Sequence, residues 1–281
     1  MLRIAVPNKG SLAEPATVML TEAGYRQRTD LKDLALADPD NAVEFFYLRP
    51  RDIAVYVGEG TLDLGLTGRD LLRDSGTDAE EVLPLGFGES TFRFAAHPET
   101  ASRLEDLAGR RIATAYPELV RAHLAGLGVQ AHVVRLDGAV ETAVRLGVAD
   151  AIADVVSTGL TLRQAGLETF GEPVLRSEAV LIRRSGAPDD PAVSQLVRRL
   201  QGVLVARRYV MLAYDVPVPL LDAACRLTPG IESPTISPLQ NREWVAVNAL
   251  IPRRETNHIM DALWDLGARG ILVTDITACR L

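Results

Sequence analysis

The sequence predicts an α/β protein with two similar lobes followed by a smaller, separate domain. Through the first two-thirds of the chain, short apolar runs that read as strands alternate with helix-compatible stretches, a pattern typical of parallel sheets covered by helices. Within these two-thirds of the chain, two short sequence patterns each occur twice, which indicates an internal repeat. From about residue 211 the order of strands and helices changes, which indicates a new domain.

The internal repeat consists of two pairs of segments. Residues 3–7 form an apolar strand that ends in a turn and a helix-compatible stretch, and residues 111–117 show the same pattern. Residues 60–68 and 147–154 each read as a helix end, an acidic turn and an apolar strand. Short segments rich in Ala, Gly and Leu also resemble one another by chance. A genuine repeat would give two lobes, each with a strand-end loop toward the other.

The chain is expected to cross between lobes near residues 90–94 and to return near residues 179–183. After a Pro- and Gly-containing loop, apolar residues at helical spacing predict one amphipathic helix that returns to the first lobe. The predicted boundaries are residues 1–90 with 184–210 for the first lobe, 91–183 for the second, and 211–281 for the last domain.

The last domain reads as strand, helix, strand, strand, helix, strand. This βαββαβ order is typical of the ferredoxin-like fold, a four-stranded sheet with two helices on one face. The open edges of such a sheet favour pairing with another copy, so we expect a homo-oligomer.

Composition narrows the class of protein. The net charge of −7 gives no basic surface for nucleic acid or an anionic membrane. Cys225 and Cys279 are the only cysteines and lack metal-ligand spacing, as expected of free thiols in a reducing compartment. A strand-like run follows Met1 directly, without a signal peptide, and no apolar run reaches the roughly 18 residues of a membrane span. We therefore expect a cytoplasmic protein with neither nucleic-acid nor membrane partners.

A candidate phosphate-binding loop follows the second acidic turn. Asp154 ends an apolar strand, Ser157-Thr158-Gly159 follow, and a helix is expected to start near Thr161. Backbone N–H groups at a helix N-terminus and nearby hydroxyls bind a phosphate monoester, and glycine permits close approach. Asp154 is placed to hold ribose hydroxyls or Mg²⁺. The same residues also fit an ordinary capped helix.

Glu141 is a second candidate ligand of the sugar or its metal. Asp137 reads as the N-cap of a helix, and Glu141 lies one turn further on. If strand ends converge at a cleft, this helix start faces the same ligand as Asp154. A position on a solvated helix face is the alternative.

Basic and polar turns in the first lobe suggest a polyphosphate side. Lys9 follows the first strand and suits a phosphate oxygen as a point charge. Arg49 and Arg51 flank a proline, and residues 67–70 end the repeated strand. Ordinary surface charge also explains some of these. The sequence contains neither a Walker loop nor a Gly-x-Gly-x-x-Gly motif, so P-loop and Rossmann chemistry are not supported.

Four segments taken together resemble the long-form ATP phosphoribosyltransferases: residues 5–10, 65–70, 111–117 and 149–159. The resemblance extends over essentially the whole chain. It implies two lobes like those of type II periplasmic binding proteins and an ACT-like regulatory domain. It also implies transfer of the phosphoribosyl group of phosphoribosyl pyrophosphate to N1 of ATP, with release of pyrophosphate, as the first step of L-histidine biosynthesis. Mg²⁺ dependence, a dimer-to-hexamer assembly and allosteric inhibition by histidine are further implications.

The resemblance also implies roles for particular residues. The phosphoribosyl pyrophosphate ligands would be Glu141, Asp154, Val156, Ser157, Thr158, Gly159 and Thr161. The ATP and pyrophosphate side would be Lys9, Gly10, Arg49, Asp70 and Tyr116. Mg²⁺ would contact Glu141 and Asp154, and histidine would contact Asp215, Ser233, Thr235 and Gly270. No side chain is expected to act as a catalytic acid, base or nucleophile. Leu160, an apolar residue in the phosphate loop, limits how many side chains there can donate.

Three other classes of protein compete with this interpretation. A two-lobed solute-binding or amino-acid-binding protein fits the lobes, but it would normally carry a signal peptide and needs no C-terminal regulatory domain. A type I phosphoribosyltransferase has two adjacent acids in its loop, whereas Ala153 precedes Asp154 here. An amino-acid sensor without catalysis is the third.

Overall fold

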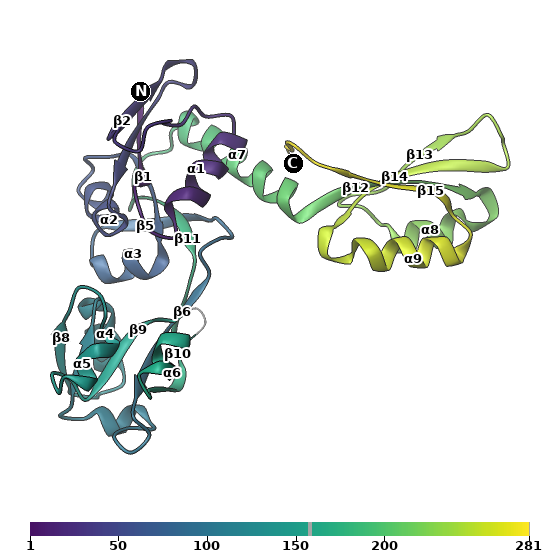
Figure 1. The fold of residues 1–281 in the computed structure, drawn as a ribbon. Coiled ribbons are helices and arrows are strands. Elements are labelled where there is room, and N and C mark those ends of the chain that lie inside the picture. Colours follow the sequence, from purple (N-terminus) through teal and green to yellow (C-terminus); the bar gives the residue numbers. More distant parts are fainter. Residues whose placement is uncertain (157–158, 281) are drawn as a thin grey trace. The chain divides into compact units, whose positions relative to one another are not determined.

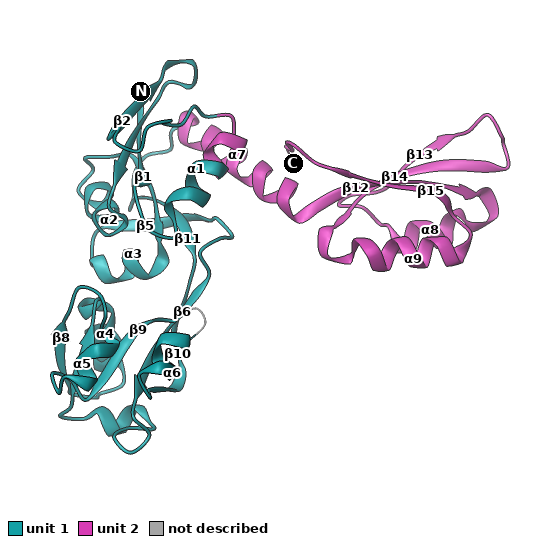
Figure 2. Cartoon of the chain, viewed as in Figure 1, with its two compact units in different colours: residues 1–18, 25–190 teal, residues 19–24, 191–281 magenta. Residues whose placement is uncertain are grey.

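The computed structural model describes residues 1–156 and 159–280. Its contacts divide the chain into two units, shown in different colours in Figure 2. The first unit holds residues 1–18 and 25–190, and the second holds residues 19–24 and 191–281.

The first unit begins with a six-stranded sheet. Its strands are β1 (Leu2–Pro7), β2 (Ala35–Asp38), β3 (Val43–Leu48), β4 (Leu64–Gly68), β5 (Ala79–Pro84) and β11 (Ala179–Arg184). The associated helices are α1 (Ala13–Glu22), α2 (Pro50–Gly58) and α3 (Arg69–Ser75). The strand order is β2-β3-β1-β4-β11-β5. β1, β2, β5 and β11 are labelled in Figure 1. β1 pairs in parallel with β3 and β4, whereas β11 is antiparallel to β4 and β5.

A five-stranded sheet forms the second lobe of the same unit. Its strands are β6 (Ser90–Ala96), β7 (Arg111–Thr114), β8 (His132–Arg135), β9 (Ala151–Val156) and β10 (Glu168–Ser177). Its helices are α4 (Pro117–Gly126), α5 (Glu141–Arg145) and α6 (Leu160–Gln164). The order is β10-β6-β9-β7-β8, with β7 parallel to β8 and β9 and with β6 antiparallel to β9 and β10.

The two sheets share one topology, which confirms the repeat. The order β3-β1-β4-β11-β5 in the first lobe corresponds strand by strand to β8-β7-β9-β6-β10 in the second. The acidic turns make the same hydrogen bonds: the Arg3 backbone N–H donates to Asp63 (2.7 Å), and the Arg111 backbone N–H donates to Asp150 (2.8 Å). The repeated segments therefore occupy equivalent places. This is the two-lobed arrangement expected of type II periplasmic-binding-protein folds.

The lobe boundaries differ from those expected at two places. β11 pairs with β4 and β5, so residues 179–183 belong to the first sheet instead of the second lobe. The long helix α7 (Pro191–Arg208) groups with the C-terminal unit instead of the first lobe. An ion pair between Arg207 and Glu22 (2.8 Å) is one of its contacts within that unit.

The C-terminal domain has the expected ferredoxin-like fold. Its elements are β12 (Tyr209–Pro217), α8 (Leu221–Leu227), β13 (Thr235–Pro238), β14 (Trp244–Pro252), α9 (Thr256–Leu266) and β15 (Arg269–Asp275). The order β13-β14-β12-β15 places the first and third strands at the centre. Leu212, Tyr214 and Val247 belong to one core cluster with Ile259 and Leu263 of α9. α8 and α9 lie on the same face of the sheet (Figure 1). The βαββαβ order expected from the sequence is confirmed.

Short 3₁₀ turns complete the chain at Pro39–Asn41, Leu104–Leu107, Val218–Leu220 and Arg253–Glu255. In the part of the chain that the structure describes, no helix combines the length and apolar character needed to cross a bilayer.

The packing of α2 on β4 depends on a residue without a side chain. A Cβ at Gly65 would lie 2.4 Å from Ile53 Cγ2 and 3.0 Å from Val57 Cγ2. We expect Gly65→Ala to lower the free energy of unfolding by about 1–3 kcal/mol through overpacking, measured by denaturant titration. Gly126→Ala in α4 is the control, because no atom lies within 4 Å of its added methyl group. Equal stability of the two variants would contradict this description of the core.

Candidate functional site

The candidate site is a cavity of about 260 Å³ between the two sheets of the first unit. Four strand-end regions line it: the turn after β1, the end of β4 with the start of α3, the turn after β7, and β9 near its end. These are the carboxyl ends of the first and third parallel strands of each lobe. The lobes therefore present equivalent strand ends to one shared cavity, as expected from the repeat. Such ends are the usual ligand-binding edge of α/β sheets.

The turn after β1 contributes Lys9 and Gly10 to the lining. Gly10 has φ +80°, a left-handed conformation that glycine adopts without strain. The side chain of Lys9 is exposed, so its ammonium group is available to an anion at the cavity mouth. Beside it, the amide oxygen of Asn8 is buried and has no hydrogen-bond partner among the described residues.

Asp70 and Tyr116 meet across the cavity from opposite lobes. Asp70, in the first turn of α3, is 7% exposed, and its Oδ1 accepts a hydrogen bond from Ser177 Oγ (2.7 Å). Burial raises the pKa of Tyr116, and the nearby Asp70 carboxylate, which is hydrogen-bonded to the phenol, raises it further. Tyr116 is therefore a neutral phenol that donates to Asp70. The edge-to-face contact with Phe92 (5.3 Å between centroids) orients its ring.

Asp154, on β9, lies outside the cavity lining, as does Glu141, but it adjoins Val155, which belongs to that lining. Burial raises the pKa of Asp154 to about 6, and the negative charges of Glu141 and Asp70 add to the effect. A hydrogen bond from the Val155 backbone N–H (2.8 Å) and the charge of Arg51 partly offset it. The structure thus brings Glu141, Asp70 and Asp154 into electrostatic contact.

The two arginines of the Arg49–Arg51 segment have different surroundings. Arg51 is engaged with Asp74 (2.6 Å) and with the Ala115 carbonyl oxygen (2.7 Å), so it is committed to protein contacts instead of the polyphosphate role considered for it. Arg49 is exposed at the N-cap position of α2. It lies outside the cavity lining but adjoins Pro50, which belongs to that lining.

The phosphate loop continues directly from Asp154. Val156 ends β9, Gly159 is the N-cap of α6 with φ +67°, and Thr161 is exposed in the first turn. α6 has only five residues, so its dipole contributes less than that of a longer helix. Leu160 is exposed, as an apolar residue turned away from the core. Ser157 and Thr158, the two predicted hydroxyl donors, lie outside the described residues.

Asp137 is not the N-cap of the helix that carries Glu141. α5 begins at Glu141 itself, with Val140 at the N-cap position. The preceding turn places Gly138 and Ala139 at positive φ, and this left-handed turn separates Asp137 from the helix. Asp137 lies instead at the surface, 3.7 Å from Arg135. Glu141 is nevertheless close enough to Asp154 for its negative charge to raise the pKa of Asp154.

The predicted histidine ligands fall into two groups on the C-terminal sheet. Asp215 on β12 lies beside Gly270, where a Cβ would be 3.5 Å from Asp215 Oδ2. Thr235 is on β13, the opposite edge strand, and Ser233 is in the loop before it. Within one chain the structure joins Asp215 to Gly270 and leaves the other two residues two strands away.

Sequence reasoning expected the chain to cross between the lobes near residues 90–94, but it assigned no role at the cavity to the start of this crossing. Gly88, Glu89 and Ser90 line the cavity, and Gly88 has φ +68°. Two glycines within three residues, at the expected crossing point, were the available signal. Ser11, Leu12 and Leu71 also line the cavity, without a signal of their own.

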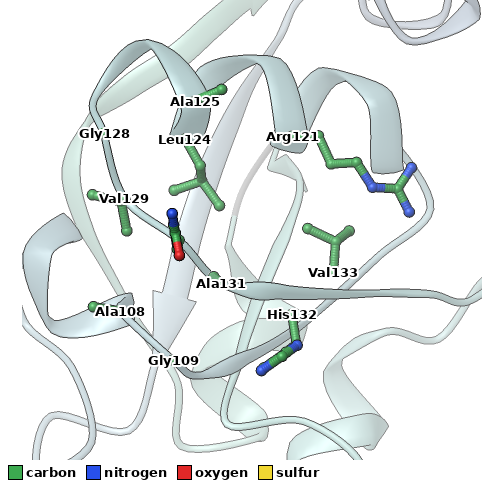
Figure 3. Close-up of a pocket in the computed structure, with 11 residues that line it drawn as sticks. Ala108, Gly109, Arg121, Leu124, Ala125, Gly128, Val129, Ala131, His132 and Val133 are labelled. Atoms are coloured by element: carbon green, nitrogen blue, oxygen red, sulfur yellow. The ribbon is translucent and has the colours of Figure 1, made fainter.

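A larger hollow, of about 720 Å³, lies beside β8 and α4 (Figure 3). Its lining is mostly small or apolar, and Arg121, Gln130 and His132 are its polar side chains. It contains none of the predicted site residues. The smaller cavity between the lobes therefore remains the candidate site.

The fold and the site define a two-lobed α/β protein with a small-molecule cavity and an appended ferredoxin-like domain. The family model described as ATP phosphoribosyltransferase matches residues 49–202, and the model of its C-terminal domain matches residues 206–278. The chain is 66% identical to the ATP phosphoribosyltransferase of Salinispora tropica over 281 residues and 62% identical to that of Arthrobacter sp. over 286 residues; each match covers 100% of both chains.

The chain belongs to the ATP phosphoribosyltransferase family, the pentosyltransferases of the first step of histidine biosynthesis. Among solved structures, it is similar to a chain of the ATP phosphoribosyl transferase (HisG:HisZ) complex from Thermotoga maritima. That match has 24% identity and a TM-score of 0.63, and it covers 73% of this chain and 98% of the other. At this identity the match supports the fold.

The raised pKa of Asp154 predicts a stability cost in the ligand-free protein. Asp154→Asn is expected to raise the free energy of unfolding at pH 7.5 by about 1–3 kcal/mol, because the buried charge is removed. The folded-state pKa of about 6 lies above the ordinary value of 3.8 for an aspartate, so the gain shrinks as the pH falls through 6 and disappears below 3.8. Denaturant titrations of both proteins across this range are the measurement. A gain that persists in acid would contradict the assignment.

Proposed function

We propose that the cavity between the lobes is where N1 of ATP attacks the anomeric carbon of phosphoribosyl pyrophosphate and displaces pyrophosphate. The observation that carries this proposal is the convergence of equivalent strand ends from both lobes on one cavity, with Asp70 in its lining and Asp154 next to it. Two lobes provide two sides, one for each substrate. Full-length similarity to transferases disfavours the alternative of a two-lobed binding protein without catalysis.

The second lobe supplies the phosphoribosyl side of the proposed site. Asp154 and Glu141 would hold the ribose hydroxyls, since carboxylates accept hydrogen bonds from such groups. The 5-phosphate would contact the loop formed by Val156, Ser157, Thr158, Gly159 and Thr161. Left-handed Gly159 leaves room for the anion to approach the backbone.

The first lobe and Tyr116 supply the ATP and pyrophosphate side. Lys9 would place a positive charge on a phosphate oxygen, and Gly10 would let the phosphate approach the turn. Asp70 and Tyr116 form a hydrogen-bonded wall of the cavity. Arg49, exposed next to Pro50 of the cavity lining, would contact the outer phosphates.

The reaction needs little acid–base chemistry from the protein. N1 of adenine already carries a lone pair, so the attacking atom requires no general base. Alignment of the two substrates and stabilisation of the departing pyrophosphate would supply most of the acceleration; positioning alone is worth up to about 7–11 kcal/mol.

Asp154 and Glu141 also fit a Mg²⁺ ion. Within residues 1–156 and 159–280, no group of three or more His, Cys, Asp or Glu side chains forms a complete metal site. Mg²⁺ in nucleotide enzymes is commonly held by one or two carboxylates together with substrate phosphates, which matches two acids beside a phosphate loop. Bound there, the ion would neutralise charge on pyrophosphate. A nearby cation would also favour the ionised form of Asp154.

The C-terminal domain is proposed to bind histidine as a feedback inhibitor in a homo-oligomer, from dimer to hexamer, in the cytoplasm. Asp215 and Gly270 lie toward one edge of the sheet, and Ser233 and Thr235 lie at the other. β13 and β15 are edge strands, whose unpaired backbone groups favour association with a second copy. Association of two such domains would bring the two groups of residues together.

Removal of the Asp154 carboxylate tests the proposed active site. Asp154→Asn is expected to lower kcat/KM by about 10²–10³-fold, because a preorganised charged contact to the sugar and its metal is lost. Product is measured by the absorbance of the N1-alkylated adenine with ATP, phosphoribosyl pyrophosphate and Mg²⁺. Asp137→Asn is the control, because Asp137 lies at the surface. Near-normal activity of Asp154→Asn would rule out this site.

The phosphate loop has a separate test. Thr158→Ala is expected to raise KM for phosphoribosyl pyrophosphate by about tenfold, the effect of one lost hydrogen bond to a charged group. KM for ATP should change much less. An unchanged KM for phosphoribosyl pyrophosphate would remove this loop from the proposal.

Histidine binding is tested at Asp215. We expect Asp215→Ala to weaken inhibition by histidine at least about tenfold, because a charge partner of the ammonium group is lost. The rate without histidine should stay unchanged. Asp222→Ala is the matched control, since Asp222 is an exposed acid of the same domain, on α8. Equal inhibition of both variants and the parent protein would exclude Asp215 from the histidine site.

A further inference from the structure

The turn that carries Tyr116 is held from the opposite lobe by one buried acid. Asp74 lies on α3 of the first lobe and is only 6% exposed. Its Oδ1 accepts hydrogen bonds from the backbone N–H groups of Glu118 (3.0 Å) and Leu119 (3.2 Å), in the first turn of α4. Its Oδ2 accepts a hydrogen bond from Arg51 Nη1 (2.6 Å). One carboxylate thus joins α2, α3 and α4.

α4 obtains its N-terminal cap from the other lobe. Its own N-cap residue is Tyr116, whose side chain makes no capping hydrogen bond within the described residues. The first N–H groups of any helix lack partners inside the helix, and Pro117 has no N–H to donate. Asp74 satisfies the next two. A carboxylate at this end also interacts favourably with the helix dipole.

Arg51 holds the same turn at two further points. Its Nη2 donates to the Ala115 carbonyl oxygen (2.7 Å), and its guanidinium carbon lies 4.9 Å from the centroid of the Tyr116 ring. The ion pair with Asp74 fixes the direction of the guanidinium group. The Ala115–Pro117 turn is therefore positioned by Asp74 and Arg51 together.

We propose that Asp74 is a positioning residue for phosphoribosyl transfer, acting through α4 and Arg51 to keep Tyr116 aligned with Asp70. This inference rests on the proposed function of the cavity. Asp74 itself does not belong to the described lining of that cavity, so its effect is exerted through the residues it holds. Two substrates bound to different lobes react only when the lobes are aligned, and a misplacement of about 1 Å can cost about 10²-fold in rate.

The test is Asp74→Asn. An asparagine has one carbonyl oxygen and one NH₂ group, so either α4 or Arg51 loses its acceptor. Even a carbonyl oxygen that faces α4 caps the helix more weakly than the carboxylate does, because it carries no charge. We expect kcat/KM to fall at least about tenfold, with a higher KM for both substrates. Without substrate, the amide protons of Glu118 and Leu119 should exchange faster with solvent. Arg51→Gln, which leaves the cap in place, should raise both KM values without this faster exchange, and it carries the test if Asp74→Asn does not fold.

Glu118→Gln is the matched control, because the Glu118 side chain is exposed on the same helical turn and pairs with Arg121. Its kinetic constants and amide exchange should match those of the parent protein. A lower melting temperature of Asp74→Asn with unchanged KM and kcat would overturn the proposal and leave a structural role only. Unchanged amide exchange in Asp74→Asn would also overturn it. A parent protein that forms no product would refute the proposed function, whereas amide exchange would still report on the contact between lobes.

Discussion

The exchange of strands between the lobes is the constraint on which the site depends. β11 returns from the second lobe and inserts between β4 and β5, and β6 enters the second sheet between β9 and β10. The returning segment is bonded directly to the site: Ser177 donates to the Asp70 carboxylate, and Glu178 pairs with Arg69 (3.2 Å). The position of Asp70 therefore depends on how the two lobes are connected. A change at this crossing would be transmitted to the cavity through covalent chain and hydrogen bonds.

Asp74 and Asp154, two acids of this unit, differ in how the protein compensates their charge. Asp74 has a full set of donors, including a guanidinium group, and its charge is compensated within the protein. Asp154 has one backbone donor and two acidic neighbours, and its pKa rises to about 6. A half-buried carboxylate whose charge is only partly offset is costly in the free protein, and its charge becomes more favourable when a cation or sugar hydroxyls bind. This difference in surroundings is what we expect if Asp74 holds the lobes together and Asp154 binds the proposed substrate.

Sequence pattern predicted the architecture well because strands and their turns are local features. The apolar runs, the repeated acidic turns and the βαββαβ order all follow from spacing along the chain. The roles of Asp74 and Arg51 could not be predicted from the sequence, because they arise from contacts between the lobes. Asp74 and Glu118, for example, are 44 residues apart in the chain. Asp137 shows the limit of a local rule: an acid before a helix was interpreted as its cap, but a left-handed turn at Gly138 and Ala139 moves it out of reach. The assignment of α7 likewise depended on tertiary contacts.

The two lobes show where a repeated fold can vary. At the amino ends of the equivalent strands, Asp63 and Asp150 accept the same backbone hydrogen bonds, so this feature serves the backbone in both lobes. At the carboxyl ends the lobes differ: Lys9-Gly10 follows β1, whereas Tyr116-Pro117 lies in the turn after β7. Ligands of α/β sheets bind at carboxyl ends. The two lobes can therefore keep the same hydrogen bonds at the amino ends of their strands and still present chemically different residues to one cavity. A site that joins two unlike substrates requires such a difference.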